Sequence, residues 1–172
     1  MLIFKFKKIF FFIFFLTSIS TNVIAETKIF YVDMDFVLSN SVIGKKIFEK
    51  LSIDENKKKE EFNNQEKELK DEENKILASR NIISEDQLNL NIKEFQNTLR
   101  NYRNFKSGEL KKLNKIRNDE IMKLLDLINP IIKEYMQKNS ISIILDKKNI
   151  YIADKNYDIS NNLIEIINKK IK

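Results

Sequence analysis

The sequence of 172 residues predicts an α+β protein, with a small β-containing body and one long antiparallel α-helical hairpin arm. Residues 26–53 and 118–172 are 47% apolar, whereas residues 54–117 are only 27% apolar and 44% charged. The middle segment has Gly108 as its only glycine or proline, which is typical of long exposed helix. A helix-start signal at Ser84 divides it in two. We call residues 54–117 the arm and the two flanking ranges the body.

The first 25 residues have the order of a secretory signal peptide. Lys5, Lys7 and Lys8 precede an apolar run of eight residues, 9–16, which is well short of the ~20 that a membrane-spanning helix needs. Small residues at the end of the segment predict cleavage after Ala25. Cleavage removes three lysines and lowers the net charge from +6 to +3, leaving a soluble protein outside the cytoplasm.

The body begins with a predicted strand and leads into the first long helix. Residues 28–33 are rich in β-branched and aromatic side chains, which favours a short strand. The helix is expected from about Ser41 to Ser79, because Phe62, Leu69 and Ile76 recur every seven residues. The other core position of each heptad is mostly polar, so this helix has one thin apolar stripe.

The second long helix is expected to start at Ser84. Ser84 and Gln87 form an S-x-x-Q capping box with acidic residues in the first turn. An apolar seam with 4-3-4-3 spacing follows, formed by Leu88, Ile92, Phe95, Leu99 and Tyr102. This spacing is typical of a helix that packs against another helix, so we predict a hairpin with its tip near residues 80–85.

The C-terminal part returns to the body. Pro130 disfavours helix at the residue before it, which predicts a kink or a new helix with Asn129 as its cap. Residues 141–146 and 150–153 are predicted as two more strands, and Asp158 as the cap of a last helix. Three short strands leave open sheet edges, which favours self-association.

Composition excludes several classes of enzyme. The chain has no histidine, no cysteine and two glycines, which rules out Ser-His-Asp triads, cysteine nucleophiles and glycine-rich nucleotide loops. We expect no catalysis, no cofactor and no metal site. One enzymatic alternative stays open, because Asp33 and Asp35 follow a hydrophobic strand as in haloacid-dehalogenase-like phosphatases, where two such carboxylates act around Mg²⁺.

Short motifs at both ends of the chain carry a family resemblance. Residues 29–38 with Ser41, Gly44 and Lys45 at one end, and residues 143–146, 150–151 and 157–160 at the other, are similar to the Skp/OmpH family of periplasmic chaperones. The resemblance implies a periplasmic homotrimer whose strands join in a central barrel and whose three arms surround a cavity. It also implies that unfolded outer-membrane proteins are held there without ATP.

Three groups of residues are the candidate functional positions. Apolar side chains of the arm are the candidates for client contact: Phe62, Leu69, Leu77, Leu90, Phe95, Tyr102 and Phe105. Basic side chains are the candidates for contact with acidic clients, lipopolysaccharide or an anionic membrane surface: Arg80, Arg100, Arg103, Lys106, Lys111 and Lys112. Apolar residues of the body are the candidates for self-association: Ile29, Tyr31, Ile143, Leu145, Ile150 and Ile152.

Two alternatives concern what these residues do. The seam of the second helix can serve only to join the two helices, and the basic run can be no more than a solvated face. An exported coiled coil that tethers partners at the cell envelope is the alternative function. Export argues against nucleic acid as a partner.

Overall fold

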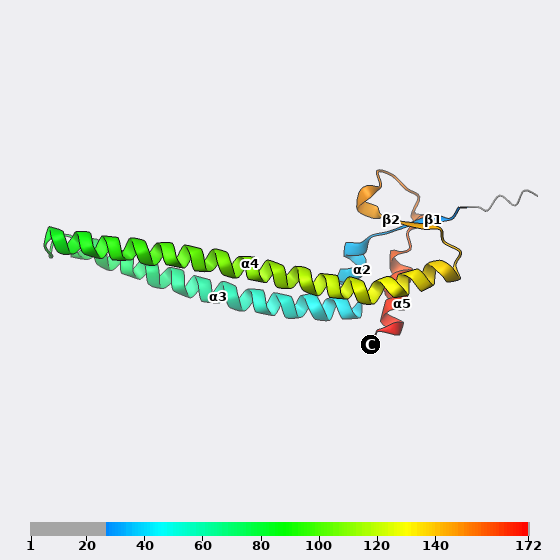
Figure 1. The fold of residues 1–172 in the computed structure, drawn as a ribbon, viewed down its shortest axis with the longest axis horizontal. Helices are drawn as coiled ribbons and strands as arrows, with labels where there is room; N and C mark the ends of the chain where they lie inside the picture. Colours follow the sequence, from blue (N-terminus) through cyan, green and yellow to red (C-terminus); the bar gives the residue numbers. More distant parts are fainter. Residues whose placement is uncertain (1–26, 172) are drawn as a thin grey trace, which may run out of the picture.

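The computed structural model describes residues 27–171, and the predicted signal peptide lies outside this range (Figure 1). The chain is mostly helical and contains one small sheet, which confirms the coarse fold class. The elements, in chain order, are β1 (Ile29–Val32), α2 (Met34–Asn40), α3 (Val42–Ser79), α4 (Glu85–Lys138), β2 (Ile143–Asp146), the 3₁₀ turns η1 (Lys147–Asn149) and η2 (Lys155–Tyr157), and α5 (Ser160–Lys170).

The antiparallel helices α3 and α4 supply the arm, residues 54–117, which extends from the body as a narrow rod (Figure 1). Both helices start with a serine cap: the hydroxyl of Ser41 accepts a hydrogen bond from the Gly44 N–H at 3.2 Å, and that of Ser84 from the Gln87 N–H at 3.3 Å. The predicted tip is confirmed, because one helix ends at Ser79 and the other begins at Glu85. With 38 residues, α3 is about 57 Å long.

The prediction of a break at Pro130 is wrong. Helix α4 runs through Pro130 without interruption, so Asn129 is not a helix cap. The helix turns away from the line of the arm where it enters the body (Figure 1). Both Ile128 and Ile131 are buried there, and this packing outweighs the loss of one backbone hydrogen bond at the exposed proline.

The sheet has two strands instead of the predicted three. Strands β1 and β2 pair in parallel, with Ile29 opposite Ile143 and Val32 opposite Asp146. Residues 150–153 do not form a strand, since no strand of the described chain lies beside them to supply hydrogen-bond partners. The predicted strand at 150–153 is therefore absent, and the predicted strands at 28–33 and 141–146 pair with each other as β1 and β2.

Helix α2 was not predicted. Its N-cap is Asp33, whose carboxylate accepts the N–H of Phe36 at 3.0 Å, and it buries Val37 and Leu38. The chain then turns sharply into α3. A Cβ at Gly44 would lie 1.7 Å from the carbonyl oxygen of Leu38, so only glycine allows the two helices to approach this closely.

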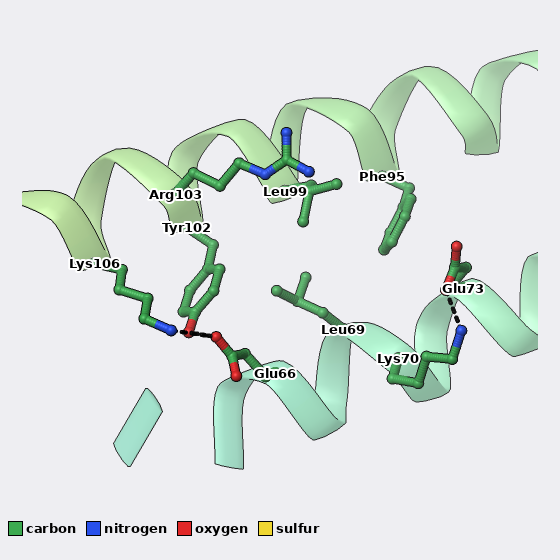
Figure 2. A pocket seen from close by; sticks show the side chains of 9 residues that line it. All are labelled: Glu66, Leu69, Lys70, Glu73, Phe95, Leu99, Tyr102, Arg103 and Lys106. Atoms are coloured by element: carbon green, nitrogen blue, oxygen red, sulfur yellow. Dashed lines mark hydrogen bonds and ion pairs between the residues drawn. The ribbon is translucent and has the colours of Figure 1, made fainter. Parts of the chain in front are cut away.

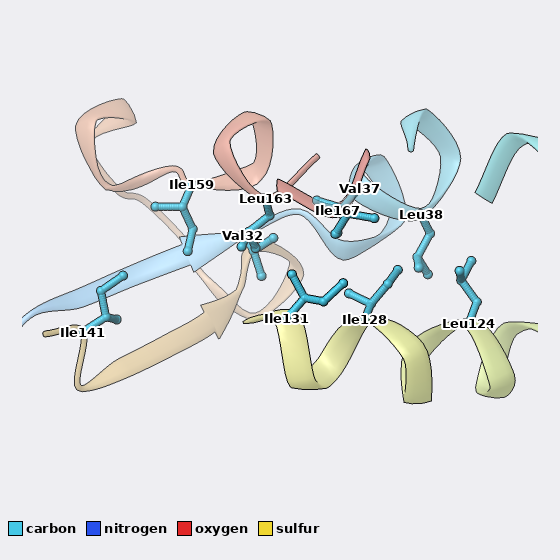
Figure 3. Close-up of a cluster of buried hydrophobic side chains, with 10 residues drawn as sticks. All are labelled: Val32, Val37, Leu38, Leu124, Ile128, Ile131, Ile141, Ile159, Leu163 and Ile167. Atoms are coloured by element: carbon cyan, nitrogen blue, oxygen red, sulfur yellow. The ribbon is translucent and has the colours of Figure 1, made fainter. Parts of the chain in front are cut away.

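The hydrophobic core lies where α4 crosses the sheet, α2 and α5 (Figure 3). Its fully buried side chains include Val37, Leu124, Ile128, Leu163 and Ile167. The last helix is preceded by Ile159 instead of the predicted cap Asp158, although the carboxylate of Asp158 still accepts the first N–H of the helix, that of Ser160, at 2.9 Å. Across residues 27–171, no helix combines the length and apolar character needed to span a membrane.

Candidate functional site

An aromatic and lysine cluster holds the middle of the arm together. The ring of Phe62 meets that of Phe105 edge to face, with ring centres 6.4 Å apart and planes at 81°. The ammonium of Lys106 lies 5.4 Å from the Phe62 ring centre, and that of Lys58 lies 6.0 Å from the Phe105 ring centre. Phe62 is 4% exposed, so this cluster is a small core outside the body.

A hydrogen-bonded network centred on Glu66 lies next to this cluster. One carboxylate oxygen of Glu66 accepts hydrogen bonds from Lys106 at 2.5 Å and from the Tyr102 hydroxyl at 2.8 Å. These two donors, Lys106 first, lower the pKa of Glu66. Burial and the hydrogen bond to Glu66 raise the pKa of Tyr102, and the hydrogen bond to Glu66 raises the pKa of Lys106. The network joins α3 and α4 through charged groups on their surface.

A second network lies toward the body. Glu109 pairs with Lys112 at 2.6 Å and with Lys58 at 3.2 Å, and both hydrogen bonds lower the pKa of Glu109, that from Lys112 the more strongly. Lys58 also pairs with Glu61 at 2.7 Å. The side chains of Lys58 and Lys112 are therefore engaged in ion pairs within the arm.

The thin apolar stripe of α3 leaves grooves along the seam. The first, here the Leu99 groove, has a volume of about 390 Å³ and lies between the two helices (Figure 2). Its floor is apolar, while its carboxylates are paired: Glu66 with Lys106, and Glu73 with Lys70 at 2.7 Å. Its lining residues are Glu66, Leu69, Lys70, Glu73, Phe95, Leu99, Tyr102, Arg103 and Lys106.

A second groove shares Leu69 and Tyr102 with the first but has a different rim. This Phe105 groove has a volume of about 440 Å³. Glu68 and Glu72 are its only charged lining residues, and the structure gives neither of them an ion pair within residues 27–171. Its lining residues are Gln65, Glu68, Leu69, Glu72, Thr98, Asn101, Tyr102 and Phe105.

A third groove, the Leu110 groove, lies nearer the body and measures about 520 Å³. Leu110 and Leu113 line it together with an edge of Phe62. Across it, the guanidinium of Arg117 bonds the carboxylate of Glu55 with its Nε at 3.1 Å. All three grooves therefore combine an apolar floor with a charged rim and stay open to solvent.

The structure brings most of the predicted apolar arm residues together. Leu69, Phe95, Tyr102 and Phe105 line the Leu99 groove, the Phe105 groove or both, and Phe62, in the aromatic cluster, lines the Leu110 groove. Nearer the tip, Leu77 and Leu90 line none of the three grooves. Their side chains are 60% and 48% exposed.

The predicted basic residues fall into three groups. Lys106 and Lys112 are engaged in the networks described above. Arg80 is the C-cap of α3 at the tip of the arm. Within residues 27–171 the structure gives no ion pair to Arg100, Arg103 or Lys111, and all three are exposed. These three cations of α4 are available to an external anion, as is the exposed Arg80 at the tip.

The body presents an apolar surface around the sheet. Ile29, Ile143, Leu145 and Ile152 are 43%, 42%, 44% and 84% exposed. Of the other predicted residues of this surface, Tyr31 is buried and Ile150 is half-buried. A groove of about 460 Å³ opens beside β1; its residues include Ile29, Tyr31, Leu145, Ile150, Ile152 and Tyr157. The outer edge of β2 has no partner in the described chain, whereas that of β1 carries one bridge, in which the Ile159 N–H donates to the Tyr31 carbonyl at 3.0 Å.

The contacts of Asp33 are those of a residue that stabilises the fold. One of its carboxylate oxygens accepts the Phe36 N–H, and the other pairs with Lys147 at 3.1 Å. These contacts, the Phe36 N–H first, lower the pKa of Asp33. Asp35 is exposed in the first turn of α2, and residues 27–171 contain no group of three acidic residues placed to hold a metal ion. The phosphatase alternative has no support from this geometry.

Sequence reasoning missed the partners that join the two helices. Glu66 and Glu55 were counted only in the charged fraction of the arm, yet they bond Lys106 and Arg117 across it. The predicted tip contains the missing signal, because residues of an antiparallel hairpin pair when they are about equally far from its tip. The buried hydroxyl of Ser160, which accepts the Asp33 N–H at 2.8 Å, had no such signal.

Comparison with known proteins places the chain in a family. The profile of outer membrane proteins (OmpH-like) matches residues 28–167. A crystal structure of a protein described as an outer membrane chaperone (OmpH-like) from Caulobacter crescentus CB15 superimposes with a TM-score of 0.70 at 17% identity, covering 86% of this chain and 88% of that one.

No curated protein matches the sequence. At 17% identity the structural likeness shows a shared fold, whereas the profile match covers most of the chain. The OmpH-like family is not a family of enzymes. This chain belongs to the family of OmpH-like outer membrane proteins.

Proposed function

We propose that this protein is a periplasmic holdase chaperone that works without ATP. It sequesters unfolded outer-membrane proteins in a cavity enclosed by the helical arms of a homotrimer. The proposal includes cleavage of the signal peptide after Ala25 and the division into a body (26–53 and 118–172) and an arm (54–117). It is supported by family membership and by the solved fold that the chain shares with a protein described as an outer membrane chaperone.

The observation that carries the proposal is the row of open grooves along the arm. Each groove offers a few apolar side chains, such as Leu69, Leu99 and Phe105, on a charged scaffold. Single contacts of this kind are worth on the order of 1 kcal/mol or less, so many of them together retain a chain without imposing a structure on it. Release then needs no fuel, because a client that folds elsewhere leaves the equilibrium.

Self-association of the body is the second part of the proposal. Isolated two-stranded sheets are marginal in water. The outer edge of β2 has no partner in the described chain, that of β1 is bridged only where Tyr31 meets Asp158, and Ile143, Leu145 and Ile152 are exposed nearby. Pairing of these edges between copies closes the sheets into a barrel and covers the apolar surface. Three copies would then hold their arms around one cavity.

An electrostatic contribution is assigned to the uncommitted cations of the arm. Arg100, Arg103 and Lys111 are exposed on α4 and are proposed to attract acidic clients or anionic lipid such as lipopolysaccharide. Since exposed charges are screened by salt, this contribution should fall as salt rises from about 0.05 to 0.5 M. Affinity that does not change with salt would contradict it.

To test the proposal, a urea-unfolded outer-membrane protein is diluted into buffer with and without the purified protein. Its aggregation is measured as turbidity. We expect aggregation to be suppressed at about one trimer per client, with the trimer mass measured by light scattering in the same buffer. A protein that leaves aggregation unchanged and instead binds one folded envelope partner is a tether, and the holdase proposal is then wrong.

A further inference from the structure

The two grooves that share Leu69 and Tyr102 differ in the charge they offer to a ligand. In the Leu99 groove both carboxylates are neutralised by lysines, which leaves Arg103 as the uncommitted charge (Figure 2). In the Phe105 groove the two charged residues are Glu68 and Glu72, and both are exposed and without an ion pair in the described chain. One groove therefore favours anions and the other favours cations.

The two carboxylates of the Phe105 groove also repel each other. Glu68 and Glu72 are four positions apart on α3, so they are neighbours on one face of the helix. Like charges at this spacing destabilise a helix, and a cation bound between them removes the repulsion. The ammonium of Lys58 lies 6.0 Å from the Phe105 ring centre, but it is already paired with Glu61 and Glu109.

The floor of the Phe105 groove suits an apolar side chain next to a cation. Phe105 is 41% exposed, and Leu69 and Tyr102 extend its apolar surface. Aromatic rings attract ammonium and guanidinium groups as well as aliphatic stems. A volume of about 440 Å³ is enough for one or two side chains.

We propose that the Phe105 groove selects cationic apolar segments, in which aliphatic or aromatic residues are flanked by lysine or arginine, from the unfolded chains that the protein binds. This inference rests on the proposed function and assigns the kind of client segment that one of its grooves takes. The arm then binds segments of both charges, with cationic ones at the Phe105 groove and acidic ones at the uncommitted arginines.

The test uses two fluorescent peptides with the same apolar centre, one flanked by lysines and the other by glutamates. Binding to the purified protein is followed by anisotropy at low salt. We expect the wild-type protein to bind the lysine-flanked peptide more tightly than the glutamate-flanked one. The double variant Glu68→Gln/Glu72→Gln should bind the lysine-flanked peptide about fivefold more weakly than the wild type does. Its affinity for the glutamate-flanked peptide should be unchanged or higher.

The matched control is Glu60→Gln/Asp71→Asn, which removes the same charge from exposed positions of α3 that do not line the groove. It should weaken binding of the lysine-flanked peptide much less. Equal losses in the two double variants would mean that net charge alone acts, and the inference would be overturned. Phe105→Ala should weaken binding of the lysine-flanked peptide further, and unchanged binding would also count against the groove.

Two further outcomes separate this inference from the proposed function. If the protein prevents aggregation of an outer-membrane protein but shows no preference for the lysine-flanked peptide, the inference fails and the holdase proposal stands. If the protein binds that peptide selectively but does not prevent aggregation, the holdase proposal fails and the inference about the Phe105 groove stands. A change of mass in solution in Glu68→Gln/Glu72→Gln would show a contact between copies, and would overturn the inference.

Discussion

Phe62 is an example of a single residue that stabilises the long arm. Although two helices side by side bury little surface, Phe62 is as buried as residues of the body. It is covered by Phe105 on the facing helix and by the ammonium group of Lys106. This cluster joins α3 to α4 far from the hydrophobic core, and its loss should loosen the arm locally.

Replacement of Phe62 by alanine measures that effect. We expect Phe62→Ala to lower the free energy of unfolding by about 3 kcal/mol, because it leaves a cavity in a packed cluster. Leu77→Ala is the control: its side chain is 60% exposed, so the change should cost less than about 0.5 kcal/mol. Urea unfolding followed by circular dichroism at 222 nm compares the two. Equal midpoints would show that the cluster contributes nothing.

A pH effect belongs to Glu134, which lies on α4 between Lys138 and Lys170. Hydrogen bonds from these lysines, Lys138 first, lower the pKa of Glu134 to about 2 from 4.5. The folded pKa lies below the unfolded one, so the stabilisation is fully present above about pH 4.5 and is lost as the pH falls toward about 2.

Thermal melts across this acidic range check the assignment. The Tm of the wild-type protein should fall more steeply from about pH 5 to about pH 2.5 than that of Glu134→Gln. The control is Glu165→Gln, which removes an exposed carboxylate of α5 for which the structure gives no ion pair. Its melts should follow the wild-type slope. Parallel slopes for all three proteins would refute the role of Glu134.

At the scale of helices, the two glycines of the chain lie in opposite environments. A Cβ at Gly108 would meet nothing within 4 Å, whereas one at Gly44 would clash with the backbone of Leu38. Gly108 therefore weakens α4 without a steric need for glycine, and Gly44 is required where α2 turns into α3.

Alanine at each position separates the two roles. Gly108→Ala should raise the free energy of unfolding by about 1 kcal/mol, because alanine is the better helix former and nothing obstructs it. Gly44→Ala should lower it by more than about 2 kcal/mol, since backbone atoms must move to admit the methyl group. Urea titrations of the two variants give both values. A stabilising Gly44→Ala would contradict the observed packing of α2 on α3.

The helices were more predictable than the sheet, for physical reasons. Ser84 and the heptad stripes are local signals, and they located the tip and both helices of the arm. Residues 150–153 have strong β propensity but no neighbouring strand within residues 27–171, so propensity alone was misleading. Helix α2 was missed because its seven residues look like an extension of the preceding strand. The break at Pro130 was predicted wrongly because tertiary packing outweighs the local preference of proline against helix.

The candidate site was predictable only in part. The seam residues Leu69, Phe95 and Tyr102 followed from their spacing, and the structure places them in grooves. The sequence could not show which charges pair with each other, because that depends on the register of α3 against α4. The different rims of the Leu99 and Phe105 grooves therefore emerged only from the structure.

At the scale of the whole molecule, the body should exist only in an assembly. The proposed interface includes Leu145 and Ile152, which are 44% and 84% exposed. We expect Leu145→Glu/Ile152→Glu to reduce the mass measured by light scattering from that of a trimer to that of one chain, because carboxylates would be buried at a closed barrel. Leu77→Glu/Leu90→Glu, on the arm, should keep the trimer. A trimer in both variants would place the interface elsewhere.

Helix α4 supplies both the arm and the core. Its N-terminal half faces α3 along the arm, and its buried Leu124, Ile128 and Ile131 sit among α2, α5 and the strand β1. No loop separates these two parts, so α4 behaves mechanically as a lever whose fulcrum is the hydrophobic core. A sideways force at Ile82, at the tip of the arm, is transmitted as a torque to Ile128 in the core. The tip can therefore move outward only as far as α3 and α4 bend.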